Sequence, residues 1–353
     1  MRRFFMFQTI WVIIGSLIGA GFASGKEIAY FFYQYGKIGV LGILISALLF
    51  GYLIWKTFRI LDHKQVQNYR EFLEEIIGKP KGMKVVHTMI NLFILLEFYI
   101  MVAGFGAYLK QEFDVPLLIG AIILSGCTYF TCKKSMQGIE KANSLAIPIL
   151  ICFIIHMGIQ NVDNHIPETL NLGMNFDKNV CWGIGNAILY ASYNGILLVP
   201  VLIGLKNEKH RKGNAKIASI TAILIAILAL CVFHILMQGS QADYVSDIPV
   251  VQIARKYGIY YPFLYGIMIA ISIYTSAIAI CFGLLENAAK KTEKSKLFLL
   301  KCVCISSIFV SFIGFSNLVE RLYPLLGIFG SLQIVFLIRY KCKESIEKKV
   351  KIV

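Results

Sequence analysis

The sequence predicts an all-α, polytopic membrane protein with about ten transmembrane helices. The 353-residue chain is 57% hydrophobic and only 16% charged, with a mean hydropathy of +0.68. A soluble protein of this size cannot bury so much apolar surface. Apolar stretches close to the roughly 20 residues that span a bilayer recur along the whole chain. Short polar connections, rich in Lys and Arg, separate these stretches.

Ten apolar segments follow one another and form a single transmembrane domain, 1–353. The first is not expected to be a signal peptide, because no small-residue cleavage site follows a short apolar region. The nine cysteines form no CxxC pair, so we interpret them as reduced hydrophobic residues rather than as a metal site or a disulfide framework. The approximate bounds of the segments are 7–33, 38–58, 83–109, 115–131, 142–159, 178–204, 215–238, 259–287, 297–316 and 320–340.

Two of the connections are predicted to be helical. The stretch QVQNYREFLEEII, residues 65–77, has the apolar spacing of an amphipathic helix that lies on a membrane surface. The stretch DIPVVQIARKY, residues 247–257, is consistent with a short helix on the opposite side. They precede the long third and eighth segments, which is the symmetry that an inverted repeat requires.

The basic residues orient the chain in the membrane. With the N-terminus in the cytoplasm and each segment crossing once, 28 of the 35 Lys and Arg residues fall on the cytoplasmic side, whereas the 20 acidic residues divide evenly. This is the pattern of the positive-inside rule. We therefore predict a multi-pass protein of the cell membrane with both termini in the cytoplasm. The net charge of +15 reflects topology and attraction to anionic lipids, not a nucleic-acid partner. The sequence does not determine an oligomeric state.

The stretch GSLIGAGFASGKE, residues 15–27, places four glycines and a Lys–Glu pair inside the first segment. Glycine is a poor helix former, and charges within a membrane segment are costly. Extended to Tyr35, the segment would form a helix of ~43 Å, longer than the ~30 Å hydrocarbon core. A break in the helix would explain the glycines, because unwound backbone at membrane depth can bind a solute and an ion. Close packing through two GxxxG pairs is the alternative.

A broken first helix predicts a second broken helix at the corresponding place of an inverted repeat. Ten segments divide into five and five, with repeats over 1–160 and 178–340, so the sixth segment should also be interrupted. It contains NAILYASYNGILLVP, residues 186–200, in which Asn194–Gly195 is a strong turn dipeptide. We expect the break there. A kinked helix that only packs is the alternative.

The stretch IGAGFASGKEIAYFF, residues 18–32, resembles the signature of the YkvI-type family of bacterial membrane proteins. That family is similar to the amino acid–polyamine–organocation superfamily, whose members share the leucine-transporter (LeuT) fold. The layout of ten segments extends the resemblance across the chain. The resemblance implies two intertwined five-helix inverted repeats, a central site at the breaks of the first and sixth helices, and transport of a solute.

The resemblance puts the solute-binding residues at the two breaks. Exposed N–H groups at the start of a half-helix favour a carboxylate, so the implied solute is a small amino acid or a related organic anion. On the first helix and then on the sixth, the implied contacts are Ser16, Gly19, Ala20, Gly21, Ser192, Tyr193, Asn194 and Gly195.

The resemblance also implies a cation site. In sodium-coupled relatives one Na⁺ lies between the first-helix break and the eighth helix. Five oxygen ligands without a full negative charge suit a monovalent cation. The alternative is that the hydroxyls bond back to their own helix. Beyond this Na⁺ we predict no metal and no cofactor. The corresponding ligands here are the carbonyls of Gly15, Ile18 and Ser272 and the hydroxyls of Thr275 and Ser276.

Three of the charged residues within the apolar segments are candidates for a functional role. Glu97, in the middle of the third segment, should face the bundle, where it handles a proton or a cation or makes a structural hydrogen bond. Lys26 and Glu27 lie just beyond the break and either line the outer pathway, pair with other helices or sit at the interface. Glu27 is a second candidate for handling a proton or a cation. Some proton-coupled relatives carry a lysine in the fifth helix. The fifth segment here has none, which favours Na⁺, whereas Glu97 favours protons.

Secondary transport is therefore the predicted function, with a small organic solute moved by Na⁺- or H⁺-coupled alternating access. We predict no enzyme activity, because the sequence contains no HExxH motif, nucleotide-binding glycine loop or aspartate-rich phosphate site. A channel-like or sensor protein on a transporter scaffold is the alternative, although the sequence has no continuous polar lining or repeated filter.

Overall fold

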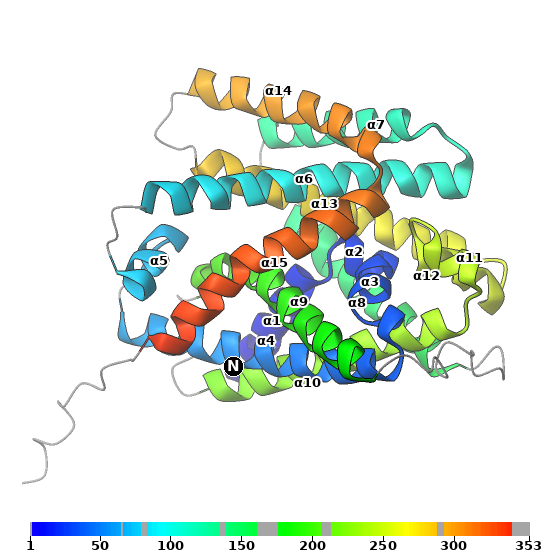
Figure 1. Cartoon of the computed structure of the whole chain (residues 1–353). Helices are drawn as coiled ribbons and strands as arrows, with labels where there is room; N and C mark the ends of the chain where they lie inside the picture. Colours follow the sequence, from blue (N-terminus) through cyan, green and yellow to red (C-terminus); the bar gives the residue numbers. More distant parts are fainter. Residues whose placement is uncertain are drawn as a thin grey trace, which may run out of the picture.

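The computed structural model describes residues 2–64, 66–78, 83–134, 139–160, 176–205, 213–287 and 293–340. Over these ranges the protein is helical and contains no strand. Most of the long helices run between the two ends of an elongated bundle (Figure 1). The predicted all-α class is therefore confirmed for the part of the chain that the structure describes.

Nine described helices of at least 18 residues build most of the bundle. Together with the short helices of the first segment they follow the order of the predicted apolar segments. Their bounds are α4 Lys37–His63, α6 Met83–Phe113, α7 Leu117–Lys134, α8 Ile139–Ile159, α9 Phe176–Gly204, α10 Asn214–Met237, α13 Tyr261–Asn287, α14 Glu293–Val310 and α15 Phe315–Arg339.

Seven helices within the described ranges are long and apolar enough to cross a membrane. They lie in α4, α6, α9, α10, α13, α14 and α15. Three shorter apolar helices, Met6–Leu17, Leu117–Lys133 and Ile147–Ile159, coincide with parts of the first, fourth and fifth predicted segments. Length and composition thus support seven membrane spans, and a total of ten remains a prediction.

The first segment is broken, as its glycines predict. Helix α1, Arg2–Leu17, ends before two non-helical residues, and helix α2, Ala20–Ser24, begins after Gly19. Gly19 is extended, with φ −86° and ψ −173°. A second interruption follows at Gly25, whose φ of 83° strongly favours glycine. Helix α3, Lys26–Phe31, then completes the segment and leads into a 3₁₀ turn, η1, over Tyr33–Tyr35.

The sixth segment is not broken, and this part of the prediction is wrong. Helix α9 is continuous through Asn194 and Gly195. The Asn194 side chain donates to the carbonyl of Tyr190, one turn earlier in the same helix, at 3.1 Å. Helix α15 packs so closely that a Cβ added to Gly330 would collide with the carbonyl of Ser192. Tertiary packing along α15 therefore overrides the local turn preference of Asn-Gly.

Both predicted connection helices are present. Helix α5, Tyr69–Ile77, begins at Asn68, whose side chain accepts a hydrogen bond from the backbone N–H of Glu71. The second connection contains α11, Gln241–Val245, α12, Pro249–Ala254, and the 3₁₀ turn η4, Arg255–Tyr257. Helix α5 lies at one end of the bundle, and α11 and α12 lie at the other (Figure 1). This placement matches the expected opposite sides, while the inverted repeat itself remains a prediction.

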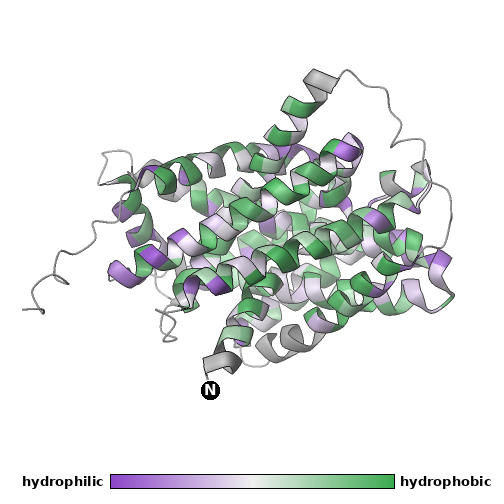
Figure 2. Cartoon of the chain, turned by 90° about the horizontal axis from the view of Figure 1, so that it is seen from below, coloured by the Kyte–Doolittle hydropathy of each residue, from purple (hydrophilic) through white to green (hydrophobic). Residues whose placement is uncertain are grey.

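The surface of the bundle is suited to lipid. Hydrophobic residues dominate the middle of the helices, and hydrophilic residues gather near their ends (Figure 2). Large apolar side chains such as Leu48, Ile223 and Phe309 are exposed. Exposing such an apolar surface to water would cost free energy, whereas contact with lipid acyl chains would not.

Candidate functional site

The break in the first helix lies against two other long helices. A Cβ added to Gly15 would lie 2.6 Å from the side chain of Ile147 in α8, and one added to Gly19 would lie 3.8 Å from Met101 in α6. The described neighbours of the break are therefore apolar on these two sides. Unwound backbone at such a depth is tolerated only where protein or a cavity receives its polar groups.

Glu27 folds back toward this break. The left-handed conformation of Gly25 redirects the chain between α2 and α3. Glu27 is only 4% exposed, and its carboxylate lies over Gly21, where an added Cβ would be 2.7 Å from the carboxyl carbon. Gly21 is thus required for close approach of this carboxylate to the backbone.

Three tyrosines surround the Glu27 carboxylate. It interacts electrostatically with the hydroxyls of Tyr193, Tyr190 and Tyr323. The rings of Tyr193 and Tyr323 stack at 4.5 Å between centroids, and Phe31 stacks on Tyr193 at 5.7 Å. The contacts are nevertheless incomplete, because Glu27 Oε2 and the Tyr193 hydroxyl each lack a partner in hydrogen-bonding geometry among the residues that the structure describes.

A second carboxyl group, Glu97, faces the same region. Its side chain is 1% exposed, and its Oε1 has no hydrogen-bond partner within the described ranges of the chain. It interacts electrostatically with Glu27 and with Tyr323. Two adjacent carboxylates buried in this way would be strongly unfavourable if both were charged. The pair therefore requires a proton or a bound cation. We call the group of Glu27, Glu97, Tyr190, Tyr193 and Tyr323 the carboxylate–tyrosine cluster.

The structure brings only some of the expected solute-binding residues to this cluster. Tyr193 is part of the cluster, and Gly21 lies against the Glu27 carboxylate. The Ser16 hydroxyl instead donates to the carbonyl of Ile13 at 2.8 Å. Gly195 faces Leu53 of α4, at 3.1 Å from an added Cβ. Ser192 is buried, and its hydroxyl has no hydrogen-bond partner in the part of the chain that the structure describes. Gly19 is extended at the break, and Ala20 is the buried first residue of α2. Asn194 lies in α9 and bonds to its own helix at Tyr190.

Two residues of the expected cation site meet, although Ser272 does so through its hydroxyl and not through the carbonyl that the resemblance implies. The Ser272 hydroxyl of α13 donates to the carbonyl of Ile18 at the break, with an oxygen–oxygen distance of 3.5 Å. The Thr275 hydroxyl donates to the carbonyls of Ile271 and Ser272 in its own helix, at 3.0 and 3.1 Å. Ser276 is half-buried. The eighth segment therefore lies beside the break as expected, while Thr275 makes the backbone bonds of the structural alternative.

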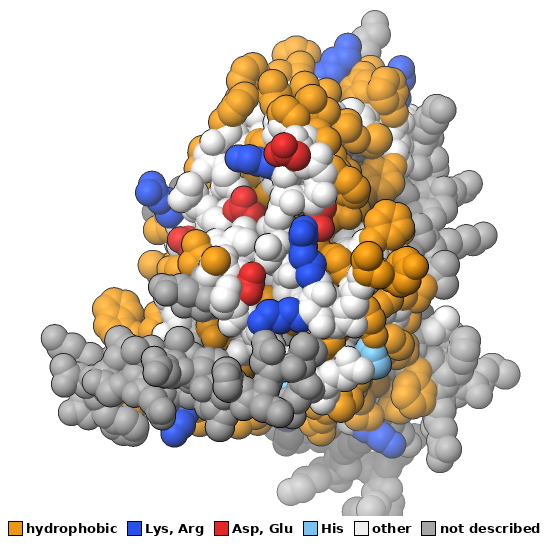
Figure 3. Space-filling view, turned by 90° about the vertical axis from the view of Figure 1, so that its right-hand side faces the viewer, with side chains coloured by type: hydrophobic (Ala, Val, Ile, Leu, Met, Phe, Trp, Pro, Cys, Tyr) orange, Lys and Arg blue, Asp and Glu red, His pale blue; other side chains and the backbone are white. Residues whose placement is uncertain are grey.

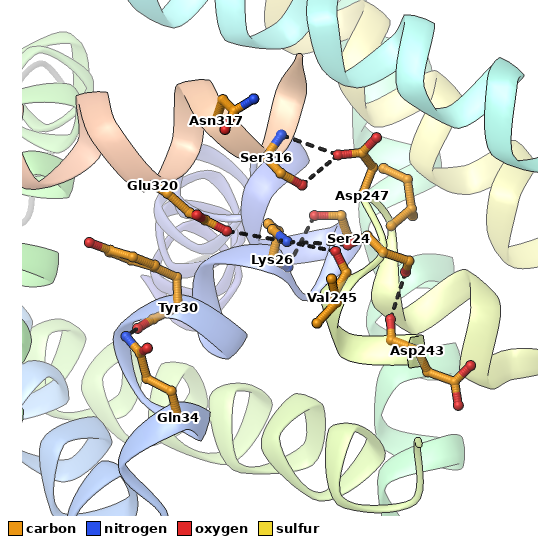
Figure 4. A network of polar contacts seen from close by, with 12 residues as sticks. Ser24, Lys26, Tyr30, Gln34, Asp243, Val245, Asp247, Ser316, Asn317 and Glu320 are labelled. Carbon is orange, nitrogen blue, oxygen red and sulfur yellow. Dashed lines mark hydrogen bonds and ion pairs between the residues drawn. The ribbon is translucent and has the colours of Figure 1, made fainter. Parts of the chain in front are cut away.

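Lys26 points away from the cluster toward the end of the bundle that carries α11 and α12. Its ammonium group donates to the carbonyls of Val245 and Ser246 at 3.1 and 3.3 Å and pairs with Glu320 of α15 at 3.4 Å (Figure 4). Of the roles considered for Lys26, pairing with other elements is therefore confirmed. One residue of α3 thus holds three elements together, while its neighbour Glu27 faces the interior.

A further contact joins the same elements. Asp247, between α11 and α12, accepts hydrogen bonds from the backbone N–H and the hydroxyl of Ser316, at 3.2 and 2.5 Å (Figure 4). Ser316 lies in the first turn of α15, where an acidic side chain is favourable. These contacts tie the start of α15 to the connection between α11 and α12.

The sequence reasoning missed Tyr190, Tyr323 and Glu320. A usable signal existed for the tyrosines, because Tyr190 and Tyr193 are three residues apart on one helix face. A buried phenol needs a polar partner, and Glu27 was available. Nothing local to Glu320 predicts its partner, which is almost 300 residues away in the chain.

Comparisons with known proteins confirm the resemblance to YkvI-type membrane proteins. The chain is 25% identical over 339 residues to the uncharacterized membrane protein YkvI of Bacillus subtilis (strain 168), covering 96% of each protein. It is 25% identical over 334 residues to the uncharacterized protein YyaD of the same organism, covering 93% of this chain and 95% of YyaD. No protein-family model matches the chain. With seven apolar helices long enough to span a bilayer, these matches support a membrane location.

A solved structure is also similar. It is the manganese transporter of Eremococcus coleocola in complex with an aromatic bis-isothiourea substituted compound. The match covers 95% of this chain and 70% of the transporter, with 12% identity and a TM-score of 0.47. A TM-score at this level does not establish a common fold.

Proposed function

We propose that this protein is a secondary transporter of the cell membrane that carries a small organic solute by proton-coupled alternating access. The single observation that carries the proposal is the pair of buried carboxyl groups, Glu27 and Glu97, with unpartnered oxygens beside the broken first helix. The proposal retains the two inverted repeats over 1–160 and 178–340 and the cytoplasmic termini. It includes no enzymatic step and no cofactor.

The carboxyl pair favours protons as the coupling ion. A buried carboxyl group is neutralised most simply by a proton, and the aromatic rings around Glu27 exclude water from it. Sodium at the carbonyl of Ile18 and the hydroxyl of Ser272 is the second candidate, supported by their approach at 3.5 Å. Because Thr275 makes bonds within its own helix, that site has fewer ligands available than the resemblance implies.

The two carboxyl groups of Glu27 and Glu97 also favour one class of solute. An amino group brings a positive charge to the two carboxyl groups, and the neighbouring aromatic rings favour a cation as well. An amino acid or a related amine therefore fits better than an organic anion without an amino group. Because there are two carboxyl groups, one proton and one ammonium group can be carried together, which corresponds to symport.

The test uses purified protein in proteoliposomes. Labelled amino acids, amines and carboxylates are screened for counterflow, which requires a saturable carrier but no ion gradient. For the solute found, uptake is then measured with an inward proton gradient and, separately, with an inward Na⁺ gradient at equal pH on both sides. We expect accumulation with the proton gradient alone.

Glu97→Gln should abolish proton-driven accumulation while preserving counterflow, because exchange of solute does not require net proton movement. The control is Glu74→Gln, which changes a carboxylate of α5 outside the carboxylate–tyrosine cluster. If accumulation is driven only by Na⁺ and is unchanged in Glu97→Gln, the coupling ion is Na⁺ at the Ile18–Ser272 site and not a proton. Absence of counterflow for every solute class would contradict transport itself and favour a sensor or channel.

A further inference from the structure

A cavity of about 540 Å³ opens at the end of the bundle that carries α12, away from the carboxylate–tyrosine cluster. It lies between the end of α6, the turn η4 and the start of α13. Six of the residues that line it matter here: Tyr108, Glu112, Phe113, Arg255, Ile259 and Phe263. No role for this cavity follows from the proposed transport site.

The cavity lies at the level where the membrane ends. One apolar span stops at Phe113, and another starts at Tyr261. A site between these two points is therefore at the boundary between acyl chains and lipid head groups. On the topology predicted from the basic residues, this boundary belongs to the outer leaflet.

The rim of the cavity is strongly apolar. Ile259 is 83% exposed and Phe263 is 56% exposed, and Phe113 at the end of α6 is also exposed. Three large apolar side chains around an open cavity would be costly in water. At this depth they can instead contact acyl chains.

The lining of the cavity also includes a guanidinium group held in a fixed place. One terminal nitrogen, Nη2, of Arg255 lies 3.2 Å from both carboxylate oxygens of Glu112. Glu112 follows Gln111, whose side-chain amide exchanges two hydrogen bonds with the backbone of Ile248 at 3.0 and 3.2 Å. This anchoring fixes the end of α6 against the connection before α12.

Arg255 has donors left over. A guanidinium group carries five N–H donors, and the contacts described for Arg255 use only Nη2, while about half of the side chain is exposed. The remaining nitrogens can bind a second anion. Arginine is suited to phosphate oxygens because two of its N–H groups can bind side by side.

Figure 3 shows the end of the bundle that carries α11 and α12. Lys, Arg, Asp and Glu side chains are interspersed in its middle, and hydrophobic side chains surround them. Such a surface has no single-sign charge field that would concentrate a free anion from solution. A ligand for the cavity must therefore combine a phosphate for Arg255 with an apolar part for the rim.

We propose that this cavity binds one phospholipid of the outer leaflet, with its phosphodiester at Arg255 and an acyl chain across Ile259 and Phe263. The phosphodiester, rather than the group beyond it, is recognised, because Glu112 offsets the charge of Arg255. A soluble phosphate would leave the apolar rim uncovered, and a lipid without phosphate would leave the free guanidinium donors unpaired.

The test is native mass spectrometry of the purified full chain in detergent. The protein is incubated with equal amounts of phosphatidylglycerol, phosphatidylethanolamine and diacylglycerol that carry the same acyl chains. We expect one retained phospholipid per chain, of either head group, and no retained diacylglycerol. Glycerophosphate, which has the phosphate but no chains, should not compete.

Two variants divide the site into its polar and apolar parts. Arg255→Gln should lower phospholipid retention about tenfold or more, the effect of losing one charge-assisted hydrogen bond. Ile259→Ser should lower phospholipid retention by a smaller factor than Arg255→Gln does, and it should do so for both head groups. The matched control is Arg321→Gln, an exposed arginine of α15 that does not line the cavity. Equal retention of diacylglycerol, competition by glycerophosphate, or wild-type retention in Arg255→Gln would each overturn the proposal, whatever the result of the transport assay.

Discussion

At the scale of single residues, the distance between Gly21 and Glu27 is the tightest constraint on the candidate site. The two residues belong to different short helices, and the left-handed Gly25 between them brings the carboxylate back over the earlier backbone. Gly19 lies nearby but is not crowded, because its added Cβ would make an ordinary van der Waals contact with Met101 at 3.8 Å. The two glycines should therefore respond differently to the same substitution.

Gly21→Ala is expected to lower the free energy of unfolding by about 1–3 kcal/mol, the usual cost of overpacking a buried site. Gly19→Ala should cost much less, since its φ of −86° is ordinary for alanine. Thermal unfolding of the purified variants measures both. Shortening the acid, as in Gly21→Ala with Glu27→Asp, should recover part of the loss. Equal effects of the two single substitutions would show that the carboxylate does not lie over Gly21.

At the scale of elements, α3 is held from outside by Lys26. The ammonium group is the contact that joins α3 to the carbonyls at the end of α11 and to Glu320. Lys26→Met keeps the length of the side chain and removes these bonds, so α3 should open more often. Amide hydrogen exchange over residues 26–31 should become faster.

The matched control for α3 is Glu320→Gln, which removes only the ion pair. Because the Glu320 side chain is 44% exposed, that pair contributes little, and exchange over the same residues should change less. Equal acceleration in both variants would mean that the carbonyl bonds of Lys26 do not hold α3.

Helix α5 provides a pH-dependent contact at the other end of the bundle. The Glu75 carboxylate accepts hydrogen bonds from Lys64 at 2.8 Å and from the Tyr340 hydroxyl at 2.5 Å. Partial burial raises the pKa of Glu75, but the bonds from Lys64 and Tyr340 and the charge of Lys64 outweigh it and hold this pKa below its usual value. The contact therefore stabilises the folded state above the pKa of the unfolded chain and is lost as the pH falls through the folded pKa.

Glu75→Gln should accordingly make amide exchange in α5 faster at neutral pH but not in acid. The difference from the wild type should shrink as the pH falls below about 4.3, the ordinary pKa of glutamate. Glu74→Gln on the same helix, which removes the carboxylate that pairs with Arg70 one turn away, serves as the control. A difference that persists unchanged at pH 3 would contradict the assignment.

At the scale of the whole molecule, α9 and α15 form a close contact through small residues. A Cβ added to Gly330 would collide with the Ser192 carbonyl, and one added to Gly327 would lie 2.8 Å from the Leu189 carbonyl. These are backbone atoms of a continuous helix and cannot move aside. The same contact sets the positions of Tyr193 and Tyr323, which stack across it.

Gly330→Ala should therefore lower the free energy of unfolding by about 1–3 kcal/mol. Gly283→Ala is the control, because that glycine lies in a helix with open space around it, and alanine there should stabilise the protein by up to about 1 kcal/mol. Denaturation of the two variants in the same detergent measures the contrast. If α9 instead broke at Asn194 and moved off α15, Gly330→Ala would be tolerated.

Local properties of the sequence were sufficient for much of this protein. Hydropathy, charge and glycine content act over a few residues, and they predicted the membrane class, the positions of the apolar segments, the break near Gly19 and the two connection helices. The burial of Glu97 followed from its place in an apolar segment. Each of these features depends on residues that are neighbours in the chain.

The tertiary structure decided what depends on contacts between distant residues. Asn194–Gly195 has the local signature of a turn, yet α9 continues because α15 packs along its backbone. Glu27 could have faced an outer pathway, but the reversal at Gly25 and the tyrosines of α9 and α15 draw it inward. Lys26, beside it, finds its partners more than 200 residues away. Such pairings are set by how whole helices pack, and the spacing of residues along the chain does not indicate how distant helices will pack.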